Sequence, residues 1–285
     1  MKKAIPLILI LCFILSSCSL QQGNTQIEID KMEYRKAIWI AYYELSEMTN
    51  GKDKYEFEKT IKEEFSKITS KGFNTVTVQV RPCADAFYKS AYFPTSRYFN
   101  GEQGSEMDYD PLEIICSYAQ QFDLKIEAWI NPYRVSQDDD YSKLSPNNFA
   151  VKNKKMTKVV DGKIYFNPAY DEVTNLIVSG VKELVENYNI SAIHFDDYFY
   201  PTQNKNFDKK EYKRYGRDLS LADWRRQKVT DMVKRAYDAV KSANKDVEFG
   251  ISPASNIEND KNNLYADVEL WVKKGYVDYI CPQVY

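Results

Sequence analysis

Two adjacent acids, Asp196 and Asp197, stand at the end of a short buried strand that the sequence predicts over residues 192–195. Because a strand alternates its faces, His194 and Asp196 share one side, and Asp197 lies just past the strand end. Acids at such a position are costly unless they are solvated, paired or functional. Hydrolysis of a glycosidic bond uses two carboxyl groups, one protonated as an acid and one ionised as a nucleophile or base, and this is the chemistry we expect.

The partner carboxyl group is expected from another strand, since sequence neighbours at a strand end usually point apart. Asp85, Glu127 and Glu44 are the candidates. Crowding and partial burial would raise the pKa of one acid, as a general acid requires. Structural alternatives stay open. Asp196 or Asp197 can cap a loop or pair with an arginine, Glu127 can be satisfied by an arginine inside the fold, and Asp85 can form a turn.

Further polar and aromatic residues follow the same predicted strand ends. Arg81 and Arg134 would bind or orient carboxylates, with ion pairs that fix loops as the alternative. His194 could donate a proton or bind a sugar hydroxyl, or it could be a satisfied interior residue. Aromatic side chains there could form platforms for sugar rings, or could serve only packing. The remaining candidates for substrate binding are Tyr88, Trp129, Asn131, Tyr133, Tyr198, Tyr200, Gln283 and Tyr285.

Alternating strands and helices would position these residues. The sequence predicts strands over residues 37–41, 74–80, 125–130, 192–195, 247–251 and 277–280, and helices over 54–71, 110–122, 169–188, 221–243 and 264–274. This alternation indicates parallel strands joined by right-handed crossovers.

The connection lengths differ at the two ends of the predicted sheet. Helix-to-strand links are about two residues long, whereas the strand-to-helix links cover about 81–109, 131–168 and 197–220. All spare chain therefore lies at the carboxyl ends of the strands, which is the catalytic face of a (β/α) barrel. We expect a C-terminally incomplete (β/α)8 TIM barrel with about six strands. An open α/β sheet is the alternative, although no glycine-rich phosphate loop follows the early strands.

The N-terminus predicts secretion and a lipid anchor. A basic start and an apolar run end in Leu15-Ser16-Ser17-Cys18, a lipobox. We therefore expect a signal peptide over residues 1–17, lipidation of Cys18, a polar tether over 18–36 and the barrel over 37–285. The protein would be extracytoplasmic and anchored to a bacterial membrane by its lipid. An ordinary cleaved signal peptide is the alternative.

Composition excludes other classes of partner. The net charge is −2 and there is no long basic run, which argues against nucleic acid. A single histidine argues against a histidine-rich zinc site, and we expect no cofactor and no metal. Cys83, Cys116 and Cys281 are too widely spaced for a disulfide framework and are expected to be small buried hydrophobic residues.

At these motifs the chain resembles the bacterial glycosyl-hydrolase-like family 10 proteins. The matching stretches are residues 78–82 with 85–88, 128–134, 193–201, 249–253 and 282–285, and the block His-Phe-Asp-Asp-Tyr-Phe-Tyr-Pro is the most specific. The resemblance implies a (β/α) barrel, often on a secreted lipoprotein. It also implies carbohydrate substrates, with cell-wall glycan stripped of stem peptides as the leading class. The chain departs from the family at Glu127, where histidine is usual, and at Cys83 and Ala84, and it lacks the last two strands.

Two further hypotheses remain. The same aromatic cleft could belong to a non-catalytic glycan-binding lipoprotein that lacks a competent acid pair. Alternatively, Asp196, Asp197 and His194 could support a metal-assisted hydrolysis such as deacetylation.

Overall fold

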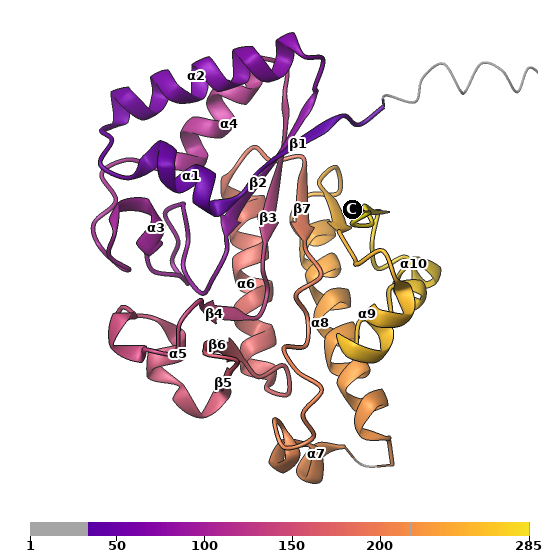
Figure 1. Cartoon of the computed structure of the whole chain (residues 1–285). Coiled ribbons are helices and arrows are strands. Elements are labelled where there is room, and N and C mark those ends of the chain that lie inside the picture. The colour runs from indigo at the N-terminus through magenta and orange to yellow at the C-terminus, as the bar shows by residue number, and fades with distance from the viewer. Residues whose placement is uncertain (1–33, 217, 285) are drawn as a thin grey trace, which may run out of the picture. The chain divides into compact units, whose positions relative to one another are not determined.

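Six parallel strands form one sheet in the order β1–β2–β3–β7–β8–β9 (Figure 1). The computed structural model describes residues 34–216 and 218–284. Spatial order follows chain order, as in a (β/α) barrel, and the predicted fold class is confirmed. The strands are β1 (Ala37–Ile40), β2 (Thr75–Arg81), β3 (Lys125–Ile130), β7 (Ala192–Phe195), β8 (Glu248–Ile251) and β9 (Tyr279–Ile280).

Five helices connect these strands and cover the sheet. Residues Phe57, Ile61, Phe65 and Ile68 give α2 a buried stripe at helical spacing. The Asp110 carboxylate accepts the Leu112 and Glu113 amides at the start of α4. In Figure 1, α6 and α8 run side by side along the sheet. The connecting helices are α2 (Lys54–Ser70), α4 (Pro111–Gln121), α6 (Asp171–Asn187), α8 (Leu221–Ala243) and α10 (Val268–Lys274).

Short helices occupy the strand-to-helix connections of the described chain. They are α1 (Tyr42–Thr49), α3 (Arg97–Asn100), α5 (Phe149–Lys152), α7 (Lys209–Tyr215), α9 (Ile257–Asn263) and the 3₁₀ turns Tyr141–Lys143 and Lys154–Met156. The sequence patterns did not predict these elements, because each is too short to show a hydrophobic period. Their common location confirms that the spare chain lies at the carboxyl ends of the strands.

The segment 131–168 is not one long loop, which corrects the sequence interpretation. It contains a three-stranded antiparallel sheet in the order β4–β6–β5, formed by β4 (Arg134–Ser136), β5 (Thr157–Val160) and β6 (Lys163–Phe166). Asp161 and Gly162 have φ of 47° and 70°, so the β5–β6 turn uses the left-handed region at both central positions. Asp-Gly favours such a turn because glycine carries no Cβ.

Strand β2 is buried along its whole length and has one irregularity. Gln79 pairs with Trp129, but the next pair is Arg81 with Ile130, so Val80 is an extra residue. A β-bulge of this kind reverses the face of every residue that follows. Arg81 therefore lies on the Ile130 face of the sheet rather than on the Trp129 face.

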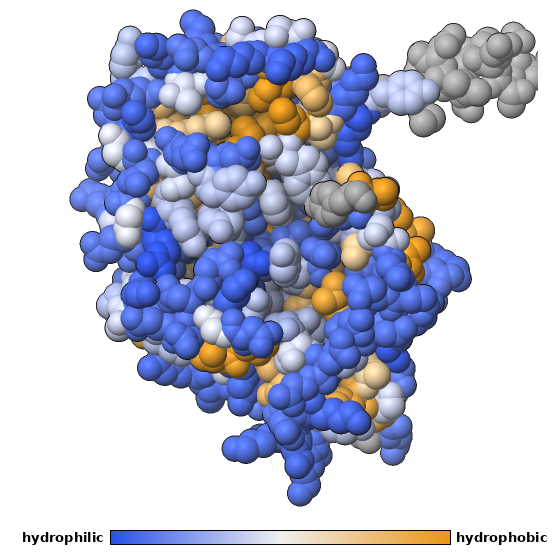
Figure 2. Space-filling model, viewed as in Figure 1, coloured by the Kyte–Doolittle hydropathy of each residue, from blue (hydrophilic) through white to orange (hydrophobic). Residues whose placement is uncertain are grey.

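Residues 1–33, with Cys18 and most of the predicted tether, lie outside the described part of the chain, as does Tyr285. Residues from Arg35 onward belong to one compact unit. Within the described ranges, no helix is both long and apolar enough to cross a membrane. Figure 2 shows a band of intermediate hydropathy across the viewed face, between a hydrophobic patch above it and a mainly hydrophilic area below it.

Candidate active site

A pocket of about 620 Å³ opens at the carboxyl ends of β1, β3, β7, β8 and β9. Its volume lies within the usual range for small-ligand sites. Five predicted site residues line it, and Glu44, a third acid considered from the sequence, lies there too. The lining includes Trp39, Tyr43, Glu44, Trp129, Asp196, Asp197, Tyr198, Ser252, Cys281 and Gln283.

Asp196 is held at the pocket wall by three N–H donors. The Trp129 indole nitrogen lies 3.0 Å and the Asn131 amide nitrogen 3.3 Å from its Oδ2. The backbone amide of Tyr198 donates to Oδ1 at 3.2 Å. Asp196 is 2% exposed, so these bonds fix its orientation in a site of low polarity.

Burial, together with the neighbouring Asp197 carboxylate, raises the pKa of Asp196 to about 6. The Trp129 hydrogen bond and the Arg134 charge act in the opposite direction. Asp196 therefore changes its charge within the range in which many enzymes work, which is a property of functional carboxyl groups.

Asp197 and Glu44 differ from Asp196 in how they are held. Asp197 is partly exposed, and its carboxylate makes no hydrogen bond to any residue of the described chain. Glu44 lies in the first turn of α1, where its Oε2 accepts the Ala41 amide at 2.8 Å. The pocket thus brings together three carboxyl groups from two different strand ends.

Arg134 and Tyr198 build part of the surface next to Asp196. The Arg134 guanidinium lies 4.3 Å from the centroid of the Tyr198 ring, a cation–π contact. Tyr198 is 51% exposed, so its ring is available to a ligand. The Arg134 amide donates to Asn131 Oδ1 at 3.2 Å, and this contact orients the Asn131 amide group toward Asp196.

His194 and Glu127 lie in the interior of the sheet rather than among the lining residues of the pocket. Glu127 Oε1 lies 3.2 Å from Arg35 Nε, and Thr77 donates to Oε2 at 2.8 Å. His194 Nδ1 lies 2.9 Å from the Tyr279 hydroxyl, and burial lowers the pKa of His194 to about 3. The imidazole is therefore neutral, and Glu127 has the arginine partner that the sequence allowed for.

Asp85 and Arg81 also lie outside this pocket. Asp85 is fully buried and accepts the Gln103 side-chain amide at 3.0 Å, which fixes the loop that follows β2. Burial raises the pKa of Asp85 to about 6. The Arg81 guanidinium lies 4.6 Å from the centroid of the Phe93 ring, on the side to which the bulge directs it.

The other predicted tyrosines of the described chain are buried in different places. Tyr133 is fully buried. Tyr200 donates a short hydrogen bond to Asp208, and Tyr88 lines a second pocket. The structure therefore brings together Trp129, Asp196, Asp197, Tyr198 and Gln283, with Asn131 and Arg134 directly behind them.

Sequence reasoning missed Trp39 and Tyr43. The Trp39 ring lies 5.0 Å from the Trp129 ring in an edge-to-face contact and 4.8 Å from the His194 ring. Its position one residue before the end of β1 was the available signal, since pocket residues of a barrel lie at strand ends. In residues 34–216 and 218–284, no three His, Cys, Asp or Glu side chains converge as metal ligands would.

Solved structures of glycoside-processing enzymes share this fold. The α-L-fucosidase isoenzyme 2 from Paenibacillus thiaminolyticus matches with a TM-score of 0.55 and 15% identity, over 78% of this chain and 32% of that one. A cycloisomaltooligosaccharide glucanotransferase from Paenibacillus sp. matches with a TM-score of 0.53 and 12% identity, over 88% of this chain and 34% of that one.

Sequence comparison identifies closer relatives. The glycosyl hydrolase YngK of Bacillus subtilis (strain 168) is 36% identical in an alignment of length 277 that covers 88% of this chain and 54% of the relative. The glycosyl hydrolase DigH of Escherichia coli (strain K12) is 34% identical in an alignment of length 241 that covers 75% of this chain and 55% of the relative. The chain thus spans about half the length of these curated relatives. Residues 34–285 match the model of the family described as glycosyl hydrolase-like 10, and the chain belongs to that family.

Proposed function

We propose that the protein hydrolyses glycosidic bonds of an extracytoplasmic polysaccharide, and that peptide-free cell-wall glycan is the substrate class. The observation that carries this proposal is Asp196, a buried carboxyl group held by Trp129 and Asn131 at the wall of a pocket. Family membership and the names of the relatives support glycoside hydrolysis in general.

Asp196 acts in its ionised form, as nucleophile or base. Its three protein contacts are all N–H donors, which stabilise a carboxylate and fix its direction. The proton donor is Asp197 or Glu44, the two other acids of the pocket. Glu44 comes from a different strand end, which suits a pair that must flank the scissile bond.

Aromatic side chains would hold the sugar. The apolar face of a pyranose packs flat on an aromatic ring, and Trp39, Trp129 and Tyr198 all line the pocket. Arg134 supports the Tyr198 ring from behind. The proposed substrate therefore lies across these rings, with its scissile bond near Asp196.

A lipid on Cys18 would place the enzyme at a bacterial membrane. The lipobox Leu15-Ser16-Ser17-Cys18 supports this part of the proposal. Replacement of Cys18 by serine in cells should abolish fatty-acid labelling and move the protein out of the membrane fraction. Unchanged labelling would remove the anchor from the proposal.

The hydrolysis is tested with purified glycan strands that carry no stem peptides. The measured quantity is the rate at which new reducing ends appear. Asp196→Asn should lower this rate by roughly 10²- to 10⁴-fold while the fold, measured by circular dichroism, stays intact. Asp85→Asn is the matched control, because Asp85 is an equally buried acid with a similar pKa outside the pocket.

An activated aryl glycoside identifies which acid is the proton donor, because its leaving group departs without protonation. Replacement of the true donor, by Asp197→Asn or Glu44→Gln, should impair cleavage of the natural glycan far more than cleavage of the aryl glycoside. Normal turnover by Asp196→Asn would contradict the proposal. Binding of glycan without new reducing ends after long incubation would instead identify a glycan-binding lipoprotein.

A further inference from the structure

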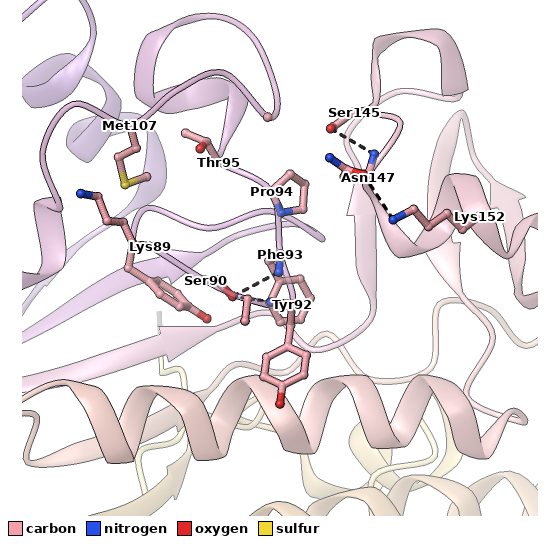
Figure 3. Close-up of a pocket in the computed structure, with 13 residues that line it drawn as sticks. Lys89, Ser90, Tyr92, Phe93, Pro94, Thr95, Met107, Ser145, Asn147 and Lys152 are labelled. Atoms are coloured by element: carbon pink, nitrogen blue, oxygen red, sulfur yellow. Dashed lines mark hydrogen bonds between the residues drawn. The ribbon is translucent and has the colours of Figure 1, made fainter.

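A second pocket of about 550 Å³ lies between two of the strand-to-helix connections (Figure 3). Residues 88–95, with Gly104 and Met107, form one wall and follow β2. Ser145, Asn147 and Lys152 form the other and follow β4. No lining residue is shared with the pocket around Asp196.

The first wall is held rigidly against α6. Glu183 of α6 accepts the Ser90 hydroxyl at 2.5 Å and the Ala91 amide at 2.6 Å. The Phe93 ring packs so closely on Gly180 that a Cβ there would lie 2.5 Å from its Cε2 atom. Ser90 Oγ also accepts the Phe93 amide at 3.1 Å, as the dashed line in Figure 3 shows.

The second wall is fixed to the first. The Gln103 side-chain oxygen accepts the Ser145 amide at 2.9 Å and the Asn148 side-chain amide at 3.0 Å. Gly104 donates its amide to Thr95 and has φ of 83°, and a Cβ on it would collide with Ser145. The pocket is therefore preformed, which lowers the entropy cost of binding.

The pocket is cationic. Lys89 and Lys152 lie on opposite sides of it in Figure 3, and no lining residue is acidic. Within the described ranges, the Lys89 ammonium group has no carboxylate partner, and that of Lys152 contacts only the Asn147 amide oxygen, at 3.3 Å. Two neighbouring acids are engaged elsewhere, since Glu183 binds the first wall and Asp110 caps α4. Lys89 also borders a smaller pocket whose lining includes Asp108 and Glu113.

Unpartnered polar groups lie at the floor. Tyr88 lines the pocket and is 1% exposed. Its hydroxyl lies close to Ser90 without a hydrogen bond of acceptable geometry to any described residue. Behind Phe93, Arg81 is 1% exposed, and its two terminal nitrogens likewise have no hydrogen-bond partner in the described chain. The Asp85 and Asp196 carboxylates act on the Arg81 charge, but buried donors without hydrogen-bond partners are costly. An anion bound above them would lower that cost.

We propose that this pocket is a non-catalytic saccharide site that binds a sugar unit carrying a carboxylate group. The carboxylate would lie between the two lysines, near the Tyr88 hydroxyl. Ser145 and Asn147 offer donors and acceptors to sugar hydroxyls, and Tyr92, 45% exposed, offers a ring to a pyranose face. The site stands apart from the hydrolytic pocket and does not depend on hydrolysis.

The test is calorimetric titration of the whole chain carrying Asp196→Asn, so that turnover cannot disturb the binding signal. The probe is trigalacturonate, compared with its fully methyl-esterified form, which has the same skeleton without charge. Trigalacturonate should bind at least about tenfold more tightly than the ester, and more weakly as salt rises. Lys89→Gln with Lys152→Gln should weaken binding about tenfold or more.

Two further variants make the test specific. Tyr88→Phe removes only the hydroxyl group and should weaken binding several-fold, roughly as the loss of one hydrogen bond does. Lys67→Gln with Lys273→Gln removes the same charge from exposed lysines of α2 and α10 and should leave binding unchanged.

Equal binding of the ester, or full binding by the Lys89 and Lys152 variant, would overturn the proposal. Equally tight binding of inorganic phosphate would also overturn it, since the site would then recognise a bare anion rather than a sugar. Loss of hydrolysis in other experiments would not affect these outcomes, because no cleavage is measured here.

Discussion

At the scale of single residues, the surroundings of Asp196 determine the pH range in which the site can be active. Every protein group that touches its oxygens donates a hydrogen bond, so the protein stabilises the carboxylate and offers no acceptor for a proton. Burial opposes this effect and raises the pKa to about 6. The balance of the two makes Asp196 ionised at neutral pH and protonated below pH 6.

The activity should therefore fall on acidification through about pH 6, where Asp196 becomes protonated and loses its negative charge. In the Trp129→Phe variant one donor to the carboxylate is lost, so the pKa rises and the acid limb moves to higher pH, by about one unit. The measurement is the pH profile of kcat/KM. Trp39→Phe is the control, because Trp39 lines the same pocket without donating to Asp196. Equal shifts in both variants would contradict this role of Trp129.

Part of the site could be read from the sequence, because strand alternation and strand ends locate side chains. Asp196, Asp197, Tyr198, Trp129 and Gln283 were found in this way. Strand alternation predicts on which face a side chain lies. It does not predict how far that side chain is from the pocket, or where a β-bulge interrupts the alternation. Glu127 has the predicted face but lies too early in its strand, so it pairs with Arg35 inside the sheet. Arg81 lies on the other face because the β-bulge interrupts the alternation.

At the scale of elements, one arginine holds the connection that follows Asp196 and Asp197. Arg225 of α8 is fully buried and binds both oxygens of Asp208, at 2.8 and 2.6 Å. It also donates to the carbonyl groups of Thr202 and Asn204. Together these bonds tie residues 202–208 to the helix layer, so the segment leaves the pocket along a fixed path.

Arg225→Met should lower the free energy of unfolding by about 3–5 kcal/mol, because it leaves Asp208 buried without a counter-charge. Urea denaturation measures this change. The adjacent Arg226→Met is the control, since Arg226 is only partly buried, its partner Asp223 is exposed, and the pair should contribute less than about 1 kcal/mol. Similar losses in both variants would show that the buried pair has no special role.

Gly180→Ala should destabilise the protein through Phe93, whose ring occupies the space of the new methyl group. The expected loss is about 1–3 kcal/mol, as for other overpacked interiors. Phe93→Leu in the same chain should recover part of it, because the smaller side chain leaves room for the methyl group. Thermal denaturation of the two single variants and the double variant measures the energetic coupling between the two positions. Strictly additive losses of stability would contradict the proposed contact.

The elements themselves were predictable where they are long. The helix 221–243 and the strand 125–130 match the sequence patterns residue for residue, since several turns or pairs establish a period. The strand 192–195 also matches, although it has only four residues. The β5–β6 hairpin carries its own local signal, Asp161-Gly162 between β-branched and apolar residues. The prediction of one long loop over residues 131–168 does not use this turn signal.

At the scale of the whole molecule, buried ionisable groups make the stability depend on pH in opposing directions. Asp85, Asp196 and Asp260 have pKa values raised to about 6, so each binds a proton more readily in the folded state and favours folding on acidification from neutral pH. His194 does the reverse, because burial lowers its pKa from 6.5 to about 3. The unfolded chain then binds a proton below pH 6.5 that the folded chain does not.

The contribution of His194 is measured by difference. His194→Gln removes the titration, so the stability advantage of the natural protein over this variant should shrink by about 2 kcal/mol between pH 7 and pH 5. Urea denaturation of both proteins at the two pH values gives the number. A constant difference would mean that the imidazole is charged or solvated in the folded protein.

The extra residue in β2 also directs the polar side chains of one strand to two sides of the sheet. Up to Gln79 its polar side chains follow the inner face, and Gln79 accepts the Tyr42 amide beside the first pocket. Beyond Val80 the next cationic group emerges on the opposite side and lies beneath the second pocket. Shortening the strand by one residue would place the Arg81 side chain on the inner face of the sheet, although its charge already acts on Asp196 from its present position. One inserted residue thus decides on which face of the sheet a buried cation lies.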